Sequence, residues 1–526
     1  MYAPTAPRRI ANWVSEELDR RVGLYLAAFS AVFLILSCMQ AATKLMWFDE
    51  LDTFYHASLP GPGAIYDALK LGADANPPLY PLLTSYFFEL WGRSELSVRL
   101  GAVLGFWVMT LCLFSFVRRR TGALFGFLAV GFILVSFVYE YAYEGRAYGA
   151  LFGFTGAALL CWQRAGEGGR RRALWTAGLA LALAGAISSH YFGILIWIPI
   201  GAGELARSFV RRRIDVAVWI ALLAGLTPIA FYLPLMRATR AAVVKDYWNP
   251  PRLSMILDTY RTMLKLSTAP VLGALGLWAI METALPADSS PATPERRGVP
   301  VGEFIAVAAL AALPVFGVVG GMLVGGYAER YTFSSMLGLA ALFAFLAFEL
   351  SRGSALLGVV FLIVFFGWFG MKSVSNVKVF QSERGARIGK PAAPLEHRNW
   401  VRYARASDLP LVLTNGVYFL QIHYYAPEDI SRRAVYLADQ DLARRYAGAN
   451  TADKILLVLR TLARQPVEDY HSFVAAHPHF LMCVNLEQTT WLFSMLVEDR
   501  TRMVLKARDD LELLFEVDTG SAPDAP

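Results

Sequence analysis

Charged residues are scarce in this chain: Asp, Glu, Lys and Arg make up 17% of its 526 residues, whereas hydrophobic residues make up 56%. A soluble protein of this length would form several domains and carry about a quarter of its residues as charged ones. Apolar runs of about 20 residues recur instead, each long enough to cross roughly 30 Å of hydrocarbon as a helix. The composition therefore excludes a soluble globular protein and predicts one that crosses a membrane several times.

Cysteine and histidine are also rare, with 4 and 7 residues. Three cysteines lie inside apolar runs and Cys483 stands alone in the polar C-terminal part, so neither a disulfide framework nor a CxxC metal site can be read. His190 has few other histidines near it in sequence and is expected to be a hydrogen-bonded or interfacial side chain, with no metal site predicted around it. The polar C-terminal part also lacks a glycine-rich phosphate loop and a nucleophile elbow.

The net charge of +7 could suggest nucleic acid as a partner, but the arginines cluster in short loops between apolar runs. That pattern orients membrane helices, because positively charged loops stay in the cytoplasm. Four arginines precede the first apolar run, and no clear small-residue cleavage site follows it, so the run is interpreted as a retained signal anchor. We therefore expect the N-terminal tail, residues 1–21, in the cytoplasm, and no nucleic-acid partner.

One topology places every arginine cluster on the cytoplasmic side. It has eleven spans within a transmembrane region of residues 22–371, at 22–43, 97–117, 124–139, 147–162, 174–189, 191–206, 216–235, 269–285, 304–324, 332–350 and 356–371. Residues 44–96 and 237–267 then form two periplasmic loops. A helix from near Leu79 to Trp91 is expected to lie in the interface plane, because it is too short to span and follows two prolines.

The residues after the last span are polar, and their apolar runs are shorter than those of the predicted spans. Buried strands are predicted at 409–415, 434–438 and 480–485, the first running into a helix at Gly416, and further helices at 455–462 and 491–497. Short strands alternating with helices indicate a small α/β domain, assigned to residues 372–519 on the periplasmic side. The last residues, 520–526, are expected to be disordered.

Five acids gather at the predicted outer mouth: Asp49, Glu50 and Asp52 after the first span, and Glu140 and Glu144 after the third. A carboxylate at a bilayer edge, beside low-dielectric walls and other acids, can have a raised pKa and serve as a general base. Asp49 is the main candidate, because two aromatic neighbours place it at the interface. Asp52 and Glu140 are expected to be solvated loop charges. No cofactor is predicted with certainty, although these carboxylates could hold a divalent cation loosely.

Basic residues also lie near this mouth. Arg99 lies about one turn inside the second span, where a cation is costly unless it pairs or snorkels to the surface, and both interpretations stay open. Arg146, Arg330 and Lys245 gather at outer helix ends and together could bind a lipid-linked phosphate. Tyrosines and tryptophans are dense on this side, mostly as an ordinary aromatic belt, although some could stack on sugar rings.

Five short motifs follow one another within residues 46–350: Phe48 to Glu50, Asn76 to Tyr80, Ser94 to Leu100, Glu144 to Tyr148, and Arg330 with Tyr331. In this order the chain resembles the polytopic glycosyltransferases that use polyprenyl-phosphate sugars. These are the dolichyl-phosphate-mannose protein mannosyltransferases and aminoarabinose transferases, especially the bacterial branch with core-sugar transferases of rhizobial lipopolysaccharide. The resemblance implies a glycosyltransferase C-type fold of about eleven transmembrane helices with a C-terminal α/β domain.

The resemblance also implies roles for individual residues. Asp49 aligns with the catalytic base and Glu50 with its neighbour, while Arg99 and Arg146 align with basic positions near the donor phosphate. The family usually has His where this chain has Asn76, and an amide cannot titrate, so no proton transfer is assigned to it. The expected substrate-binding residues are Arg99, Arg146, Glu144, Tyr148, Asn76, Tyr80, His190, Lys245, Arg330 and Tyr331.

The implied activity is inverting sugar transfer on the periplasmic side of a bacterial inner membrane. The donor is a polyprenyl-phosphate sugar, and the acceptor is a glycolipid, polysaccharide or protein. A transporter or flippase is the first alternative, but it would place charges deep in mid-span and show internal repeats. An oligosaccharide ligase is chemically close, yet such enzymes are usually organised around a large late outer loop. A scaffold without activity is also compatible with the sequence.

Overall fold

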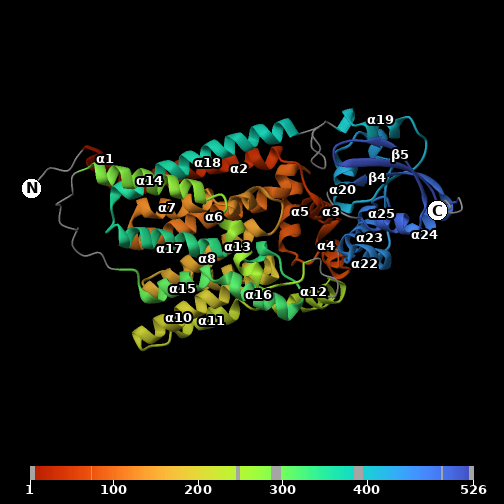
Figure 1. The fold of residues 1–526 in the computed structure, drawn as a ribbon. Helices are drawn as coiled ribbons and strands as arrows, with labels where there is room; N and C mark the ends of the chain where they lie inside the picture. Colours follow the sequence, from red (N-terminus) through yellow and green to blue (C-terminus); the bar gives the residue numbers. More distant parts are fainter. Residues whose placement is uncertain are drawn as a thin grey trace, which may run out of the picture. The chain divides into compact units, whose positions relative to one another are not determined.

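The computed structural model describes residues 6–72, 74–243, 249–285, 298–383, 395–486 and 490–520. The chain divides into two compact units. The first consists of Met1–Ala41, Arg99–Leu233 and Pro251–Asn376, and the second of Ala42–Val98, Pro234–Pro250 and Val377–Pro526. The first unit is built of helices, and the labelled strands all belong to the blue C-terminal part of the second (Figure 1).

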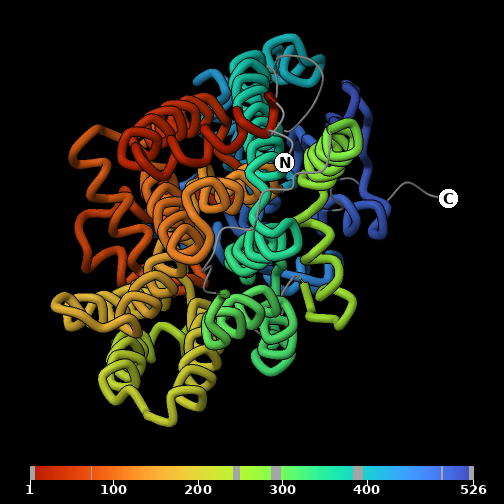
Figure 2. Tube along the Cα trace, turned by 90° about the vertical axis from the view of Figure 1, so that its left-hand side faces the viewer, coloured from red at the N-terminus to blue at the C-terminus, as the bar shows by residue number. Residues whose placement is uncertain are grey.

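Long apolar helices make up most of the first unit. Its earlier elements are α1 (Ala6–Arg20), α2 (Val22–Thr43), α6 (Glu95–Thr121), α7 (Ala123–Leu134), η1 (Phe137–Tyr143), α8 (Tyr148–Glu167), α9 (Arg172–Ser189), η2 (Tyr191–Ile196) and α10 (Trp197–Arg211). Its later ones are α11 (Val216–Ala224), α13 (Ser254–Leu264), α14 (Thr268–Ala284), α15 (Val301–Ala311), α16 (Leu313–Val324), η4 (Glu329–Thr332) and α17 (Ser335–Leu350). Helices α12 (Pro228–Val243) and α18 (Ala355–Glu383) begin in the first unit and end in the second. Figure 2 looks nearly along these helices and shows them packed side by side.

The helices have the length and composition of membrane spans. In the part of the chain that the structure describes, six are long and apolar enough to cross a membrane, or up to nine if each of three bent pairs is one span. The pairs bend by 81° between α7 and η1, 61° between α13 and α14, and 51° between α15 and α16. Every predicted span falls on a helix or on consecutive helices. The chain is therefore a multi-pass membrane protein, as predicted, while the number eleven stays a prediction.

Small and polar residues bring the helices of the first unit together. A Cβ atom on Gly105 of α6 would lie 2.4 Å from the Gly149 carbonyl oxygen of α8, so glycine is required at this crossing. Gln40 of α2 donates to the hydroxyl of Tyr139 at 2.8 Å and accepts from Asn376 of α18 at 3.0 Å. These hydrogen bonds connect α2, η1 and α18 inside the bundle.

Three short helices follow α2: α3 (Phe48–Ala57), α4 (Gly61–Lys70) and α5 (Leu79–Trp91). Helix α5 begins at Leu79 after Pro77 and Pro78, as the sequence predicts, because proline fits the first turn of a helix but not its interior. Its position relative to the membrane plane stays a prediction.

The predicted C-terminal α/β domain is built on a sheet of six strands, three of which were predicted. Its order is β3-β2-β1-β4-β6-β5, and the strands are β1 (Leu411–Leu413), β2 (Ala434–Ala438), β3 (Val467–Asp469), β4 (His479–Asn485), β5 (Arg502–Arg508) and β6 (Glu512–Asp518). The first four are parallel, whereas β6 is antiparallel to β4 and β5. The helices are η5 (Leu395–His397), α19 (Asn399–Arg405), α20 (Gly416–Tyr425), α21 (Glu428–Ser431), α22 (Gln440–Ala447), α23 (Thr451–Ala463), α24 (Tyr470–Ala476) and α25 (Trp491–Glu498).

Helix α3 belongs to the hydrophobic core of this same unit. Leu51 and Phe54 of α3 are buried in one cluster with Leu411 of β1 and Phe419 of α20. The cluster that includes Val412, Phe480 and Trp491 is separate from it. The acid-bearing helix is therefore packed on the α/β domain, although the two are far apart in the sequence.

Candidate active site

The two acids in the first turn of α3 have different surroundings. The Trp47 N–H, just before the helix, donates to Glu50 Oε2 at 3.3 Å, and the Glu50 side chain is fully buried. Glu50 thus satisfies one of the backbone donors that a helix N-terminus leaves without an intrahelical acceptor. Asp49 is only half-buried, in the same turn, where the positive end of the helix favours a negative charge. The two acids thus differ in burial, Glu50 being fully buried and Asp49 half-buried, and their catalytic roles stay predictions.

Asp52 is not the solvated loop charge that the sequence suggests. It is 3% exposed, and its Oδ1 lies 3.3 Å from His56 Nδ1, one turn further along α3. Burial of both side chains against the core explains the difference, and the i,i+4 spacing of an acid and a histidine could have revealed the pair. Glu140 retains a side chain that is 35% exposed and lies 3.7 Å from Lys372 Nζ.

Helix α20 holds the chain immediately before α3. The Met46 N–H donates to the Tyr425 hydroxyl at 2.9 Å, and Gln421 Nε2 donates to the Met46 carbonyl at 2.9 Å. The Tyr425 hydroxyl also lies 3.5 Å from Glu95 Oε1, to which it donates. Met46 itself is fully buried. We call this arrangement of Met46, Gln421 and Tyr425 the Met46 clamp. It fixes the backbone three residues ahead of Asp49, and it was not predicted, because Gln421 and Tyr425 are 375 and 379 residues from Met46 in sequence.

Asn76 and Tyr80 have local partners. Asn76 Nδ2 donates to Asp74 Oδ1 at 2.9 Å. Tyr80 is 2% exposed, and its hydroxyl donates to the Val98 carbonyl at 2.8 Å, which ties α5 to the start of α6. These contacts show that the motif organises the loop between α4 and α6. A contact of either residue with substrate stays a prediction.

Arg99 does not snorkel. It is fully buried and donates from Nη1 to the Ala41 carbonyl at 2.6 Å. Ala41 lies in the last turn of α2, where carbonyls lack intrahelical donors and the helix dipole is negative. The arginine thus joins the end of α2 to the beginning of α6. Its place near a donor phosphate stays a prediction.

Four residues predicted separately come together in the first unit. Arg330 Nε donates to the Tyr148 hydroxyl at 2.8 Å, and the Tyr148 ring lies 5.6 Å from the His190 ring. The His190 ring in turn lies 4.7 Å from that of Tyr331. We call these four residues the Tyr148 cluster. It combines a guanidinium, which suits an anion, with aromatic faces, which suit a sugar.

His190 also has a defined hydrogen-bonding state. Its Nδ1 accepts from the Phe192 N–H at 3.1 Å, so this nitrogen carries no proton and caps η2. The Arg146 N–H donates to the Glu144 carbonyl at 2.7 Å, which closes a tight turn, and both side chains are buried. This turn leads directly into α8 and the Tyr148 cluster. Lys245 lies outside the described residues.

Over the residues described, no group of three or more His, Cys, Asp or Glu side chains could hold a metal ion. The loosely held divalent cation at the outer carboxylates therefore stays a prediction.

Comparison with known families identifies part of the chain. Residues 75–236 match the model of the dolichyl-phosphate-mannose-protein mannosyltransferase family. The match covers less than half of the chain. The predicted glycosyltransferase class is thereby confirmed. The matched range includes Arg99, the turn from Glu144 to Arg146, and His190. No curated protein matches the chain significantly in sequence.

Two solved structures share the fold of this chain over nearly its whole length. ArnT from Cupriavidus metallidurans in the apo state has 14% sequence identity and a TM-score of 0.54, covering 94% of this chain and 98% of that one. ArnT from the same organism bound to undecaprenyl phosphate has 14% identity and a TM-score of 0.53, covering 95% and 99%. The predicted aminoarabinose transferase-like fold, glycosyltransferase C-type with a C-terminal domain, is confirmed.

Proposed function

We propose that the chain transfers a sugar from a polyprenyl-phosphate-linked donor to a cell-envelope acceptor, on the periplasmic side of a bacterial inner membrane. The mannosyltransferase domain supports the reaction class. The undecaprenyl phosphate bound to ArnT, which has a similar fold, supports a polyprenyl phosphate as the carrier. The acceptor is a glycolipid, a polysaccharide or a protein, since each offers a hydroxyl or amine.

The observation that carries the mechanism is the contrast between the two acids of α3. Glu50 is fully buried and caps the helix, whereas Asp49 is half-buried in the first turn of a helix that the Met46 clamp precedes. We assign Asp49 as the general base. It takes the proton of the acceptor hydroxyl or amine as that atom forms a bond to the anomeric carbon.

The same displacement breaks the bond between the anomeric carbon and the phosphate oxygen. A single displacement inverts the anomeric centre, and the negative charge moves to the departing polyprenyl phosphate. Arg146 and Arg330 are proposed to stabilise that charge, because a guanidinium fork matches a phosphate. Arg99 and Lys245 are proposed further cations for the donor. Tyr148 orients Arg330 through its hydrogen bond, and His190 with Tyr331 offers rings to the sugar.

The test is sugar transfer by the purified full chain in lipid, with a panel of radiolabelled polyprenyl-phosphate sugars and a membrane glycolipid extract. Asp49→Asn retains the shape of the side chain and should reduce turnover by about 10²- to 10⁴-fold. Asp67→Asn is the matched control, because Asp67 is an exposed acid of the neighbouring helix α4, with a side chain 71% exposed. Chelation by EDTA, followed by addition of Mg²⁺, tests the proposed loosely held cation in the same assay.

The outcomes separate the parts of the proposal. Full turnover by Asp49→Asn would overturn the base assignment and leave the reaction class standing. Failure to consume any lipid-linked sugar would overturn the donor class and favour a transporter or a scaffold.

A further inference from the structure

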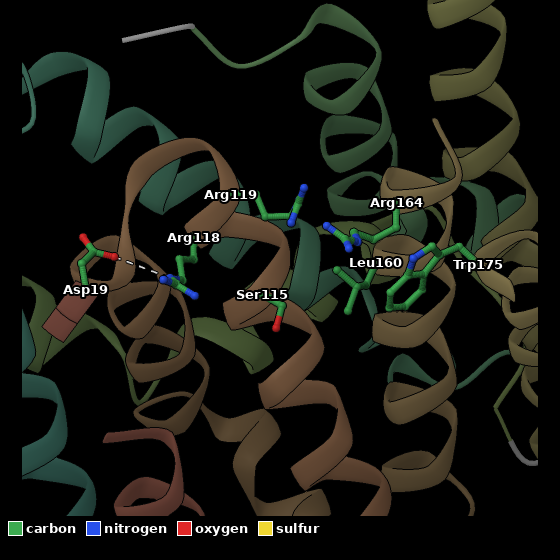
Figure 3. A pocket seen from close by; sticks show the side chains of 7 residues that line it. All are labelled: Asp19, Ser115, Arg118, Arg119, Leu160, Arg164 and Trp175. Carbon is green, nitrogen blue, oxygen red and sulfur yellow. Dashed lines mark hydrogen bonds and ion pairs between the residues drawn. The ribbon is translucent and has the colours of Figure 1, made fainter. Parts of the chain in front are cut away.

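A cavity of about 550 Å³ lies in the first unit at the helix ends rich in arginine. Its lining comes from four helices and consists of Asp19, Ser115, Arg118, Arg119, Leu160, Arg164 and Trp175 (Figure 3). Figure 3 shows the guanidinium groups of Arg119 and Arg164 turned toward each other, with Arg118 on the other side of Ser115. We call this cavity the arginine pocket. None of the residues assigned to sugar transfer belongs to it.

Cations exceed acids in the arginine pocket. Three arginines and one carboxylate, that of Asp19, line it; outside the lining, Glu167 pairs with Arg119 through both carboxylate oxygens. Arg118 Nε is 3.5 Å from Asp19 Oδ1, at the outer limit of a hydrogen bond, and Arg164 Nη1 is 3.4 Å from Glu167 Oε2. Over the described residues, Arg118 and Arg164 each use one guanidinium nitrogen in these contacts, whereas Arg119 uses two. Further N–H groups of Arg118 and Arg164 are thus available to a tetrahedral anion.

The other wall of the arginine pocket is apolar. The Arg164 guanidinium lies 5.0 Å from the centre of the Trp175 ring, and Leu160 lines the cavity beside it. Trp175 is in the first turn of α9, and Arg118 is in the last turn of α6, both helices that pass as membrane spans. A tryptophan and an arginine at such helix ends lie at the level of lipid headgroups. Guanidinium groups that can donate hydrogen bonds to a phosphate therefore lie next to an apolar wall. A phospholipid would present its headgroup and the start of its acyl chains at this level of the membrane.

We propose that the arginine pocket binds the phosphate headgroup of an anionic phospholipid of the membrane. The distribution of arginines predicts that this leaflet is the cytoplasmic one, which is rich in anionic lipid. The guanidiniums of Arg118 and Arg164 bind the phosphate oxygens, Ser115 adds a hydroxyl, and Trp175 with Leu160 packs against the glycerol and upper acyl chain. The site is separate from the sugar-transfer site and does not depend on the proposed reaction.

The experiment counts lipids bound to the purified full chain by native mass spectrometry. Phosphatidylglycerol is titrated against phosphatidylcholine with the same acyl chains, and inorganic phosphate is added in a separate arm. Arg118→Gln combined with Arg164→Gln should weaken the tightest phosphatidylglycerol site at least tenfold. Arg170→Gln combined with Arg213→Gln removes the same charge from exposed arginines outside the pocket and should change binding less than twofold.

A second variant guards against misfolding. Arg118→Lys combined with Arg164→Lys retains both positive charges but loses the planar guanidinium groups that bind a phosphate through two N–H groups. It should bind phosphatidylglycerol with intermediate affinity. Equal loss in the pocket and control variants would overturn the proposal, because it would reduce the effect to overall charge. Equal binding of phosphatidylcholine, or full displacement of the lipid by millimolar inorganic phosphate, would overturn it as well.

Discussion

Replacing Tyr425 by phenylalanine should loosen α3 from the C-terminal domain without unfolding that domain. The substitution removes the hydroxyl that accepts from the buried Met46 N–H at 2.9 Å, and a buried donor left without its partner costs about 1–3 kcal/mol. The remaining contacts are retained, because Gln421 still donates to the Met46 carbonyl and Phe54 still packs 5.2 Å from Tyr424.

That cost acts on the local opening of α3. A change of 1–3 kcal/mol corresponds to an opening constant about 5- to 150-fold larger. Hydrogen exchange of the full chain in lipid measures it directly, since the amides of residues 48–57 should exchange faster by that factor. Peptides covering β1 and β4 serve as the internal reference and should not change.

A matched control is Tyr446→Phe, which removes a tyrosine hydroxyl from α22 of the same domain and leaves the Met46 clamp intact. Gln421→Leu removes the other half of the clamp, and its effect should combine non-additively with that of Tyr425→Phe, since both act on one residue. Unchanged exchange of α3, or an equal increase over the whole sheet, would refute a local role for the clamp. If Asp49 is the base, turnover should fall with the fraction of molecules in which α3 is packed on the C-terminal domain.

Three further predictions concern single side chains. Glu512→Ala should cost about 3–5 kcal/mol of unfolding free energy in the C-terminal domain, because it leaves the fully buried Arg398 without a carboxylate 2.8 Å away and Trp400 Nε1 without its acceptor at 2.7 Å. Glu498→Ala, which removes an exposed partner of Arg445, should cost less than about 1 kcal/mol in the same denaturation experiment. Burial raises the pKa of Asp453 from 3.8 to about 7, so the unfolded chain ionises first, and stability should fall by roughly 4 kcal/mol as pH rises from about 4 to about 7. Denaturation of Asp453→Asn should lack this slope, and an unchanged slope would contradict the assignment to Asp453. Tyr148→Phe should lower kcat/KM for the lipid-linked donor about fivefold, the equivalent of about 1 kcal/mol, because Arg330 loses its acceptor at 2.8 Å. The control Tyr232→Phe removes a hydroxyl next to Ser188 and should leave kcat/KM unchanged.

Local signals in the sequence were enough to predict the position of many helices and strands. Strand β2 occupies 434–438 as predicted, and α5 begins at Leu79, because an apolar run and a proline pair act on the backbone nearby. Helix α18 continues to Glu383, well beyond the predicted end of the span at Met371. Hydropathy indicates where the apolar part of a helix ends, and the helix can continue past that point with polar residues.

Contacts distant in sequence could not be predicted. Met46 and Tyr425 are 379 residues apart, and no periodicity relates them. The burial of Asp52 was missed for a related reason. The i,i+4 spacing to His56 is visible in the sequence, but the surface of β1 and α20 on which α3 packs is distant in sequence. Strands β3, β5 and β6 were also missed. Strand β3 has only 3 residues, and β5 is largely exposed and has arginine at both ends.

The hydrogen bond between Gln40 and Asn376 has a consequence for biogenesis. The two residues are 336 positions apart, so α2 enters the membrane long before the ribosome has made α18. Polar groups within lipid need partners from the protein itself. The contact that Asn376 provides therefore forms only after the last apolar helix is inserted, and chains truncated before α18 should remain substrates for membrane quality control.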